Sequence, residues 1–163
     1  MKPTLLFRRC ALAAAALVLI SASAVRAEPD QTAGPGFYRS AETAALGLPF
    51  SDAVRVGDLL FLSGQIGTLP ATLDLAPGGV EGQARAAMDH IGRILAAQGL
   101  GFEDLAKCTV MLADMADWPA FNSVYVTYFE TGRYPARSAF GASGLALGGA
   151  LEIECMAVFP PDG

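Results

Sequence analysis

Residues 80–95, VEGQARAAMDHIGRIL, decide how the rest of the chain folds. Apolar side chains recur there at steps of three and four residues with charged residues between them, which is the pattern of an amphipathic helix. Gly99 is expected to end this helix, because glycine tolerates the left-handed conformation that is common just after a helix. Residues 108–112, CTVML, then predict a strand because they include β-branched side chains.

Two strands are expected before this helix, and a second helix and two more strands after it. Residues 53–63 hold short apolar runs around a Gly57-Asp58 turn, which is typical of a hairpin. Asp117 is expected to cap the second helix by accepting amide hydrogen bonds, with Pro119 in its first turn, where a missing N–H does no harm. The remaining segments are a loop at 64–79, a glycine-rich connector at 141–149, and strands at 138–140 and 151–159.

The order of elements, ββ-α-β-α-ββ, predicts an α/β (α+β) domain with a single mixed β-sheet and both helices packed on one face. Two helices cannot cover both faces of a sheet. The opposite face would then expose apolar residues such as Phe61, Met156 and Val158. Association of subunits is the expected cover, and it would create pockets between chains.

The first 27 residues have the composition of a secretory signal peptide. A positively charged start, MKPTLLFRR, precedes an apolar run at 10–20, and residues 25–27 (VRA) fit a signal-peptidase site. A single-span membrane anchor is the alternative to a signal peptide, but the apolar run is short for one. The Arg8-Arg9 pair leaves both the Sec and the twin-arginine export routes open. The expected organisation is a signal peptide at 1–27, a flexible leader at 28–47 and a folded domain at 48–163, located in the periplasm or secreted.

Cleavage after Ala27 would leave 136 residues with seven basic and sixteen acidic side chains, a net charge of −9. A domain this acidic has no electrostatic footprint for a phosphate backbone, so nucleic acid is not an expected partner. No membrane contact is expected after cleavage.

The chain has one histidine, His90, and three cysteines, which do not fit the spacing of a tetrahedral zinc site, so no metal is expected. His90 is interpreted as a partly exposed helix residue, since no nucleophile motif accompanies it. Cys108 and Cys155 lie in apolar strands and are interpreted first as small buried hydrophobes, with a disulfide as the alternative in an oxidising compartment.

Arg137 and the pair Glu152 and Glu154 are the side chains best suited to chemistry. A guanidinium binds a carboxylate through two parallel hydrogen bonds, which makes Arg137 a candidate anion-binding residue. The two glutamates share one face of their strand, because strand side chains alternate. An ion pair between Arg137 and one of these glutamates is an equally good interpretation from the residues alone.

Six short motifs stand out: SGQI at 63–66, QAR at 83–85, LADM at 112–115, Asn122, PARS at 135–138 and EIE at 152–154. In this order and at this spacing they resemble the RidA/YjgF family. The resemblance runs from about residue 49 to residue 158, which is nearly all of the expected domain.

The resemblance implies a chorismate-mutase-like fold assembled as a homotrimer, with three clefts between subunits. It also implies a cofactor-free hydrolysis of reactive 2-imino acids, formed from enamines, to 2-keto acids and ammonia. Arg137 would hold the substrate carboxylate, and Glu152 would position and activate the attacking water. The substrate-binding neighbours would be Ser63, the Gly64 amide, Asn122, Phe50 and Ala139.

Two of these positions depart from the family pattern. Phe50 stands where a tyrosine is common, which removes a hydroxyl, and Ala139 replaces a common cysteine but keeps the backbone carbonyl. Export is a third departure, because most relatives are cytosolic. A non-catalytic trimeric binder or sensor of small carboxylates in the periplasm is therefore the alternative. Ribonuclease activity has been attributed to relatives, and the charge of −9 argues against RNA here.

Overall fold

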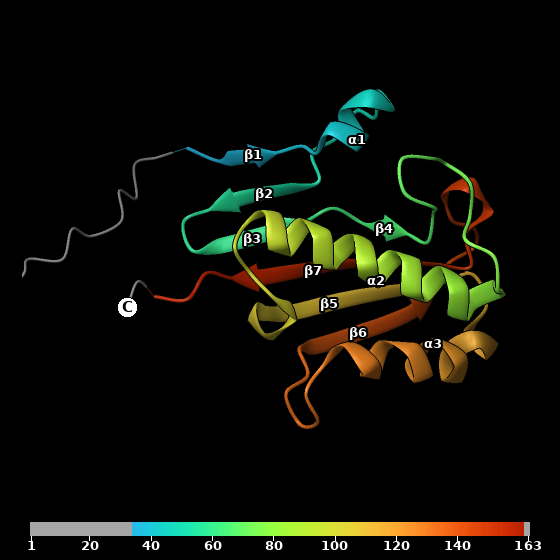
Figure 1. The fold of residues 1–163 in the computed structure, drawn as a ribbon. Helices are drawn as coiled ribbons and strands as arrows, with labels where there is room; N and C mark the ends of the chain where they lie inside the picture. The colour runs from blue at the N-terminus through green and yellow to red at the C-terminus, as the bar shows by residue number, and fades with distance from the viewer. Residues whose placement is uncertain (1–33, 162–163) are drawn as a thin grey trace, which may run out of the picture.

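The structure, a computed structural model, describes residues 34–161 (Figure 1). The expected signal peptide at 1–27 lies outside the described residues. The helices are α1 (Ala41–Ala45), α2 (Gly79–Ala97) and α3 (Trp118–Tyr125), and the strands are β1 (Gly36–Tyr38), β2 (Ala53–Val56), β3 (Leu59–Leu62), β4 (Gln65–Ile66), β5 (Leu105–Leu112), β6 (Ala136–Gly141) and β7 (Leu151–Val158).

One sheet runs in the order β1-β2-β3-β7-β5-β6, and the short β4 pairs with β7. Only β5 and β6 are parallel among the described pairs, so the sheet is mixed, as predicted. The last strand in the sequence, β7, lies in the middle of the sheet between β3 and β5. It therefore joins the hairpin half to the other half of the domain.

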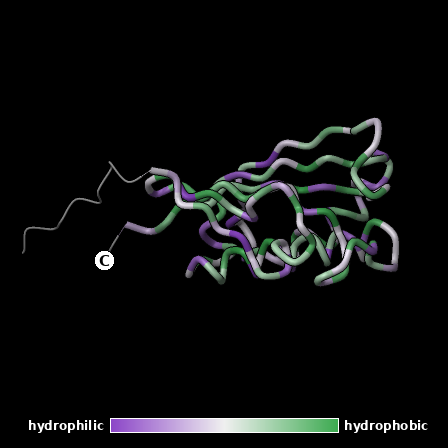
Figure 2. Tube along the Cα trace, turned by 90° about the horizontal axis from the view of Figure 1, so that it is seen from above, coloured by the Kyte–Doolittle hydropathy of each residue, from purple (hydrophilic) through white to green (hydrophobic). Residues whose placement is uncertain are grey.

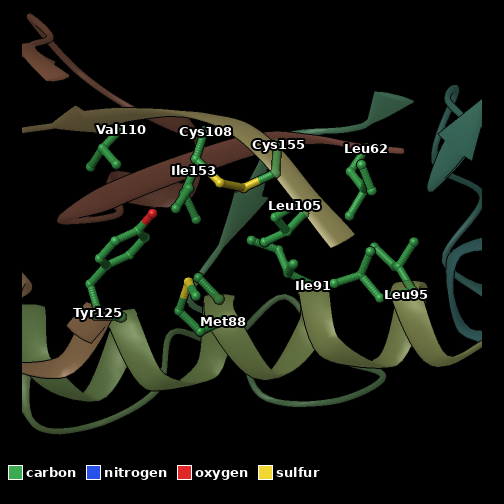
Figure 3. Close-up of a cluster of buried hydrophobic side chains, with 14 of the residues drawn as sticks. Leu62, Met88, Ile91, Leu95, Leu105, Cys108, Val110, Tyr125, Ile153 and Cys155 are labelled. Carbon is green, nitrogen blue, oxygen red and sulfur yellow. A yellow bond between two sulfur atoms is a disulfide. The ribbon is translucent and has the colours of Figure 1, made fainter. Parts of the chain in front are cut away.

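Helices α2 and α3 pack on the same face of the sheet (Figures 1 and 2). The apolar stripe of α2 forms the core with the inward side chains of β5 and β7, as Met88, Ile91 and Ile153 show (Figure 3). Gly99 has a φ of 74° after the last turn of α2, and Gly57 has a φ of 58° in the hairpin turn. The predicted fold class, the hairpin and the end of the first helix are confirmed.

The opposite face of the sheet carries no helix within residues 34–161. It exposes apolar side chains with exposed fractions between 38% and 50%, namely Val56, Leu59, Phe61, Phe140 and Val158. We call this surface the open face. The sequence predicted this exposure in a single chain, because two helices cover only one face of the sheet.

The expectation of a flexible leader up to residue 47 is wrong from Gly36 onward. Strand β1 pairs with β2, and Ser40 caps α1 by accepting a 3.1 Å hydrogen bond from the Thr43 amide. The Asp52 carboxylate then accepts 2.6 Å hydrogen bonds from the Ser40 amide and the Thr43 hydroxyl. These contacts order elements of only three and five residues, which are too short to show a periodic pattern.

The predicted cap of the second helix is also wrong. Asp117 makes no capping hydrogen bond; instead Asp114 accepts a 2.8 Å bond from the Ala116 amide and caps a 3-10 turn, Met115–Asp117, that runs directly into α3. Pro119 lies in the first turn of α3, as expected. The capping residue is therefore Asp114, three residues before the expected Asp117, because the 3-10 turn precedes the helix and supplies its first hydrogen bonds.

Cys108 and Cys155 are joined by a disulfide (Figure 3) with a sulfur–sulfur distance of 2.05 Å. The first interpretation, two unlinked hydrophobes, is therefore wrong, and its alternative is correct. Both residues are almost fully buried, and they lie directly opposite each other on the antiparallel strands β5 and β7. This register places their Cα atoms 4.1 Å apart, and register is not visible in a single sequence.

Candidate active site

A β-bulge between β3 and β4 builds one part of the candidate site. Phe61 lies opposite Met156 and Gln65 lies opposite Ile153, so the three residues 62–64 span the interval that two residues span on β7. An extra residue of this kind bends a strand and redirects its side chains. The bulge carries the predicted site residues Ser63 and Gly64.

Gly64 lies directly against the Glu152 side chain. A Cβ at position 64 would be 1.9 Å from the Glu152 Oε1 atom and 2.9 Å from its Cδ atom, so any side chain there would displace the carboxylate. Glu152 is half-buried on the open face, opposite Ile66 on one side and Met111 on the other. The glycine thus leaves the room that this carboxylate occupies.

The Ser63 side chain is engaged with the backbone. Its hydroxyl donates a 2.6 Å hydrogen bond to the Ser51 carbonyl, and its amide donates a 2.9 Å bond to the Asp52 carbonyl. These bonds tie the bulge to the segment that carries Phe50, whose side chain is 45% exposed. Phe50, Ser63, Gly64 and Glu152 therefore form one group, which we call the glutamate group.

Arg137 lies among aromatic rings at the other edge of the sheet. Its guanidinium carbon is 4.6 Å from the ring centroid of Trp118, 4.6 Å from that of Tyr125 and 5.9 Å from that of Phe121. All three rings belong to α3. A guanidinium stacked on rings is held in place while its N–H donors stay available for an anion.

Two buried polar atoms without a hydrogen-bond partner lie on α3 one turn apart, Asn122 Oδ1 and the Tyr125 hydroxyl. Burial raises the pKa of Tyr125 to about 12, although the nearby Arg137 charge opposes that rise. Buried polar atoms are nearly always paired, so unpaired ones indicate a missing partner such as a ligand or water. The Arg137 guanidinium contacts the Tyr125 ring, and Asn122 lies one turn before Tyr125 on α3. We call these three residues the arginine group.

Ala139 lies two residues after Arg137 on β6 and opposite Val110, so it points to the helix side of the sheet and packs against the core. It lies on the same strand as Arg137. Its side chain is not near the bulge, since β6 is the edge strand and β7 and β5 lie between it and β3.

The two groups do not meet within one chain. Arg137 lies opposite Cys108 and faces the helices, whereas Glu152 lies opposite Met111 and faces the open side, with strand β5 between them. Among residues 34–161 the only ion pair joins Arg133 to Glu130. The hypothesis of an ion pair between Arg137 and a glutamate is therefore wrong, although Glu152 and Glu154 do share a face, as the alternation predicted.

A cavity of about 300 Å³ adjoins the glutamate group and was not predicted from the sequence. Phe50, Gly64 and His90 are among the residues that line it. His90 is half-buried, and its Nε2 atom is 3.0 Å from the Thr68 carbonyl, to which it donates. Burial, followed by the Arg93 charge, lowers the pKa of His90.

A model of the family described as "Endoribonuclease L-PSP" matches residues 41–159. The chain belongs to this family. The match agrees with the RidA/YjgF motifs of the sequence. Among curated relatives, the goat (Capra hircus) 2-iminobutanoate/2-iminopropanoate deaminase is 46% identical over 118 residues, which cover 72% of this chain and 85% of that protein. The chloroplastic Reactive Intermediate Deaminase A of Arabidopsis thaliana is 38% identical over 138 residues, covering 85% and 69%.

Solved structures of similar proteins share the fold. Yersinia pestis YyfA, described as a member of the conserved Rid protein family, superposes with a TM-score of 0.71 at 29% identity and covers 77% of this chain and 99% of its own. The crystal structure of E. coli TdcF with bound serine gives a TM-score of 0.65 at 35% identity, covering 69% and 89%. The predicted single mixed sheet with helices on one face is therefore the fold of the family.

Proposed function

We propose that the protein is a cofactor-free deaminase that hydrolyses reactive 2-imino acids to 2-keto acids and ammonia. The names of the relatives support this activity. The observation that supports this activity in the present chain concerns Arg137. Its side chain is stacked on aromatic rings and pairs with no carboxylate among residues 34–161. An arginine held in this way is free to bind the carboxylate of a substrate.

The chemistry needs few parts. Arg137 orients the substrate through its carboxylate, and Glu152 accepts a proton from a water molecule as that water adds to the electrophilic imine carbon. The tetrahedral intermediate then collapses, the carbon–nitrogen bond breaks, and the nitrogen leaves as ammonia after taking up a proton. The net reaction consumes one water and leaves a 2-keto acid.

We propose a homotrimer in which the cleft lies between subunits. Two observations support it: the open face exposes apolar side chains, and the arginine and glutamate groups face opposite sides of one chain. Contact between copies would bury the open face and would bring the arginine group of one copy to the glutamate group of another.

We also propose that the protein is exported to the periplasm or beyond. The charged start and apolar run of residues 1–27 support a cleaved signal peptide. The Cys108–Cys155 disulfide supports an oxidising compartment, because disulfides rarely persist in the cytosol. Mass spectrometry of the exported protein should find Glu28 as the first residue; an intact Met1 on cytosolic protein would contradict export.

The function is tested with imines generated by an amino-acid oxidase, whose decay is followed with and without the protein. Arg137→Ala should lose binding and turnover, and Arg137→Lys should not rescue them, because lysine lacks the fork geometry. Glu152→Gln should still bind a stable 2-keto acid while the rate falls by about two to four powers of ten.

Melting curves on the same preparations control for folding. If the two residues served only stability, both variants would melt earlier and the folded protein would keep its activity. Full imine turnover by folded Arg137→Ala would contradict the assignment. Binding of 2-keto acids without any turnover by the unmodified protein would favour a carboxylate sensor instead.

A further inference from the structure

The cavity beside Phe50 and Gly64 gathers apolar side chains that are otherwise exposed. It lies between α1, the loop at 68–73, α2 and the turn Ala146–Gly148. Side chains from four separate segments surround it with exposed fractions between 36% and 50%, namely Leu46, Phe50, Leu69, Leu73 and Leu147. Apolar groups gathered around a hollow of this size are typical of a small-molecule site.

Backbone strain is found at the same cavity. Ala71 and Leu147 are the only non-glycine residues between 34 and 161 with a positive φ, 58° in each case, and both line the cavity. The left-handed conformation is unfavourable for a residue with a Cβ, so it persists only where the surrounding structure holds it. Such residues cluster at ligand sites. This observation is independent of the apolar lining.

Several polar groups of the lining are already bonded within the protein, whereas the charged side chains of Glu42 and Arg93, which also line it, make no hydrogen bond or ion pair within residues 34–161. Asp52 accepts hydrogen bonds from Ser40 and Thr43, and the His90 Nε2 atom donates to the Thr68 carbonyl. Phe50, which also lines the cavity, adds a ring without a hydroxyl. Apart from these two charged side chains, the cavity offers an occupant mainly apolar contacts.

We propose that this cavity binds the side chain of the 2-imino acid and that the enzyme favours branched or aromatic apolar substrates. The inference rests on the proposed function, because Glu152 lies against Gly64, which also lines the cavity. The substrates in the relatives' names carry only a methyl or an ethyl group. A cavity of about 300 Å³ holds the liquid volume of about ten waters, so such a group would leave most of it unfilled.

The first experiment compares kcat/KM for two imines, 2-iminopropanoate made from alanine and 2-imino-4-methylpentanoate made from leucine. One methylene in an apolar pocket is worth about 10- to 200-fold in kcat/KM. We therefore expect the leucine-derived imine to be favoured at least about tenfold. Equal values for the two imines, or a preference for the smaller one, would overturn the inference while leaving the deaminase activity intact.

Two variants fill the cavity, Leu73→Trp and Leu69→Trp, so that the test survives if one of them fails to fold. Each should lower kcat/KM for the leucine-derived imine at least about tenfold and change that for the alanine-derived imine less than about twofold. Val126→Trp is the matched control, because Val126 is 45% exposed on a turn outside the cavity. An unchanged preference in both folded cavity variants would overturn the inference.

Binding of stable 2-keto acids tests the cavity even if the protein turns over no imine. A lack of turnover by itself would refute only the proposed function. By calorimetry, 4-methyl-2-oxopentanoate should bind at least about tenfold more tightly than 2-oxopropanoate, and Leu73→Trp should remove the difference. Equal binding would overturn the inference. So would a change of assembly mass in Leu73→Trp by light scattering, because it would show that a second copy covers the cavity.

Discussion

Gly64 has no side chain, and the Glu152 carboxylate lies where one would be. Because φ at Gly64 is outside the left-handed region, the backbone accepts alanine there. Gly64→Ala should therefore push the carboxylate aside and lower kcat by about 100-fold, the effect of misplacing a reacting group by about 1 Å. The free energy of unfolding, measured with urea, should change by less than about 1 kcal/mol.

Gly34→Ala is the control for this change, since a Cβ at Gly34 would meet nothing within 4 Å. Its activity should match the unmodified protein. Normal activity in Gly64→Ala would show that the position of the Glu152 carboxylate does not matter for turnover.

His90 is the only imidazole in the chain, so its titration can be followed by NMR in untagged protein. Burial and then the Arg93 charge lower its pKa, and the midpoint should lie below the usual value of about 6.5. The folded state thus prefers the neutral ring. The stability that this gives is fully present above about pH 6.5 and is lost as the pH falls through the lower folded pKa.

Arg93→Gln should raise the midpoint, because it removes the second cause of the shift. His90→Gln should flatten the dependence of the unfolding free energy on pH between about 7.5 and 5.5. A midpoint at or above the usual value would contradict the buried environment of the ring.

The disulfide acts on the sheet, because it joins β5 and β7 across 47 residues of chain. Closing a loop of that length restricts the unfolded chain, and natural disulfides of this kind are worth about 2–4 kcal/mol. The double variant Cys108→Ala/Cys155→Ala should lose about that much free energy of unfolding in urea. In a reductant, the unmodified protein should unfold at about the same urea concentration as this double variant. Equal urea midpoints for the protein with and without the disulfide would contradict the expectation.

The sequence predicts elements well where a period is long enough to be seen. Helix α2 shows its stripe over 19 residues, and the hairpin shows its turn at Gly57. Strand β1 and helix α1 are too short for any period, and they depend on a tertiary contact with Asp52. The bulge at 62–64 and the disulfide depend on strand register, which one sequence does not contain.

The candidate site shows the same division. Arg137 and Glu152 could be named from their motifs, but the rings of Trp118 and Tyr125 around Arg137 look like ordinary core residues on the face of a helix. Only the packing of α3 against β6 shows that they hold a charge. That the two groups face opposite sides also depends on register.

At the scale of the whole molecule, a cleft between copies makes a specific prediction. Arg137→Ala and Glu152→Gln, each nearly inactive, should recover activity when they are unfolded together and refolded as a mixture. Each cleft would take its arginine from one copy and its glutamate from the next, so about a quarter of the clefts would be intact.

The control mixes Arg137→Ala with the double variant Arg137→Ala/Glu152→Gln, and it should recover nothing, since no copy carries the arginine. Light scattering should report about three times the mass of the mature chain for both mixtures. Failure of the first mixture to recover activity after co-assembly would contradict a cleft that takes its arginine and its glutamate from different copies.

The central position of β7 has a consequence for how the chain is made. Strands β1–β3 and β5–β6 share no edge with each other until residues 151–158 lie between them. A nascent chain emerging from the ribosome therefore carries two half-sheets without their common neighbour until residues 151–158 have emerged. Pairing between strands so far apart in the sequence is slow to form. The sheet, and the core that it shares with α2, therefore cannot be completed before this strand is synthesised.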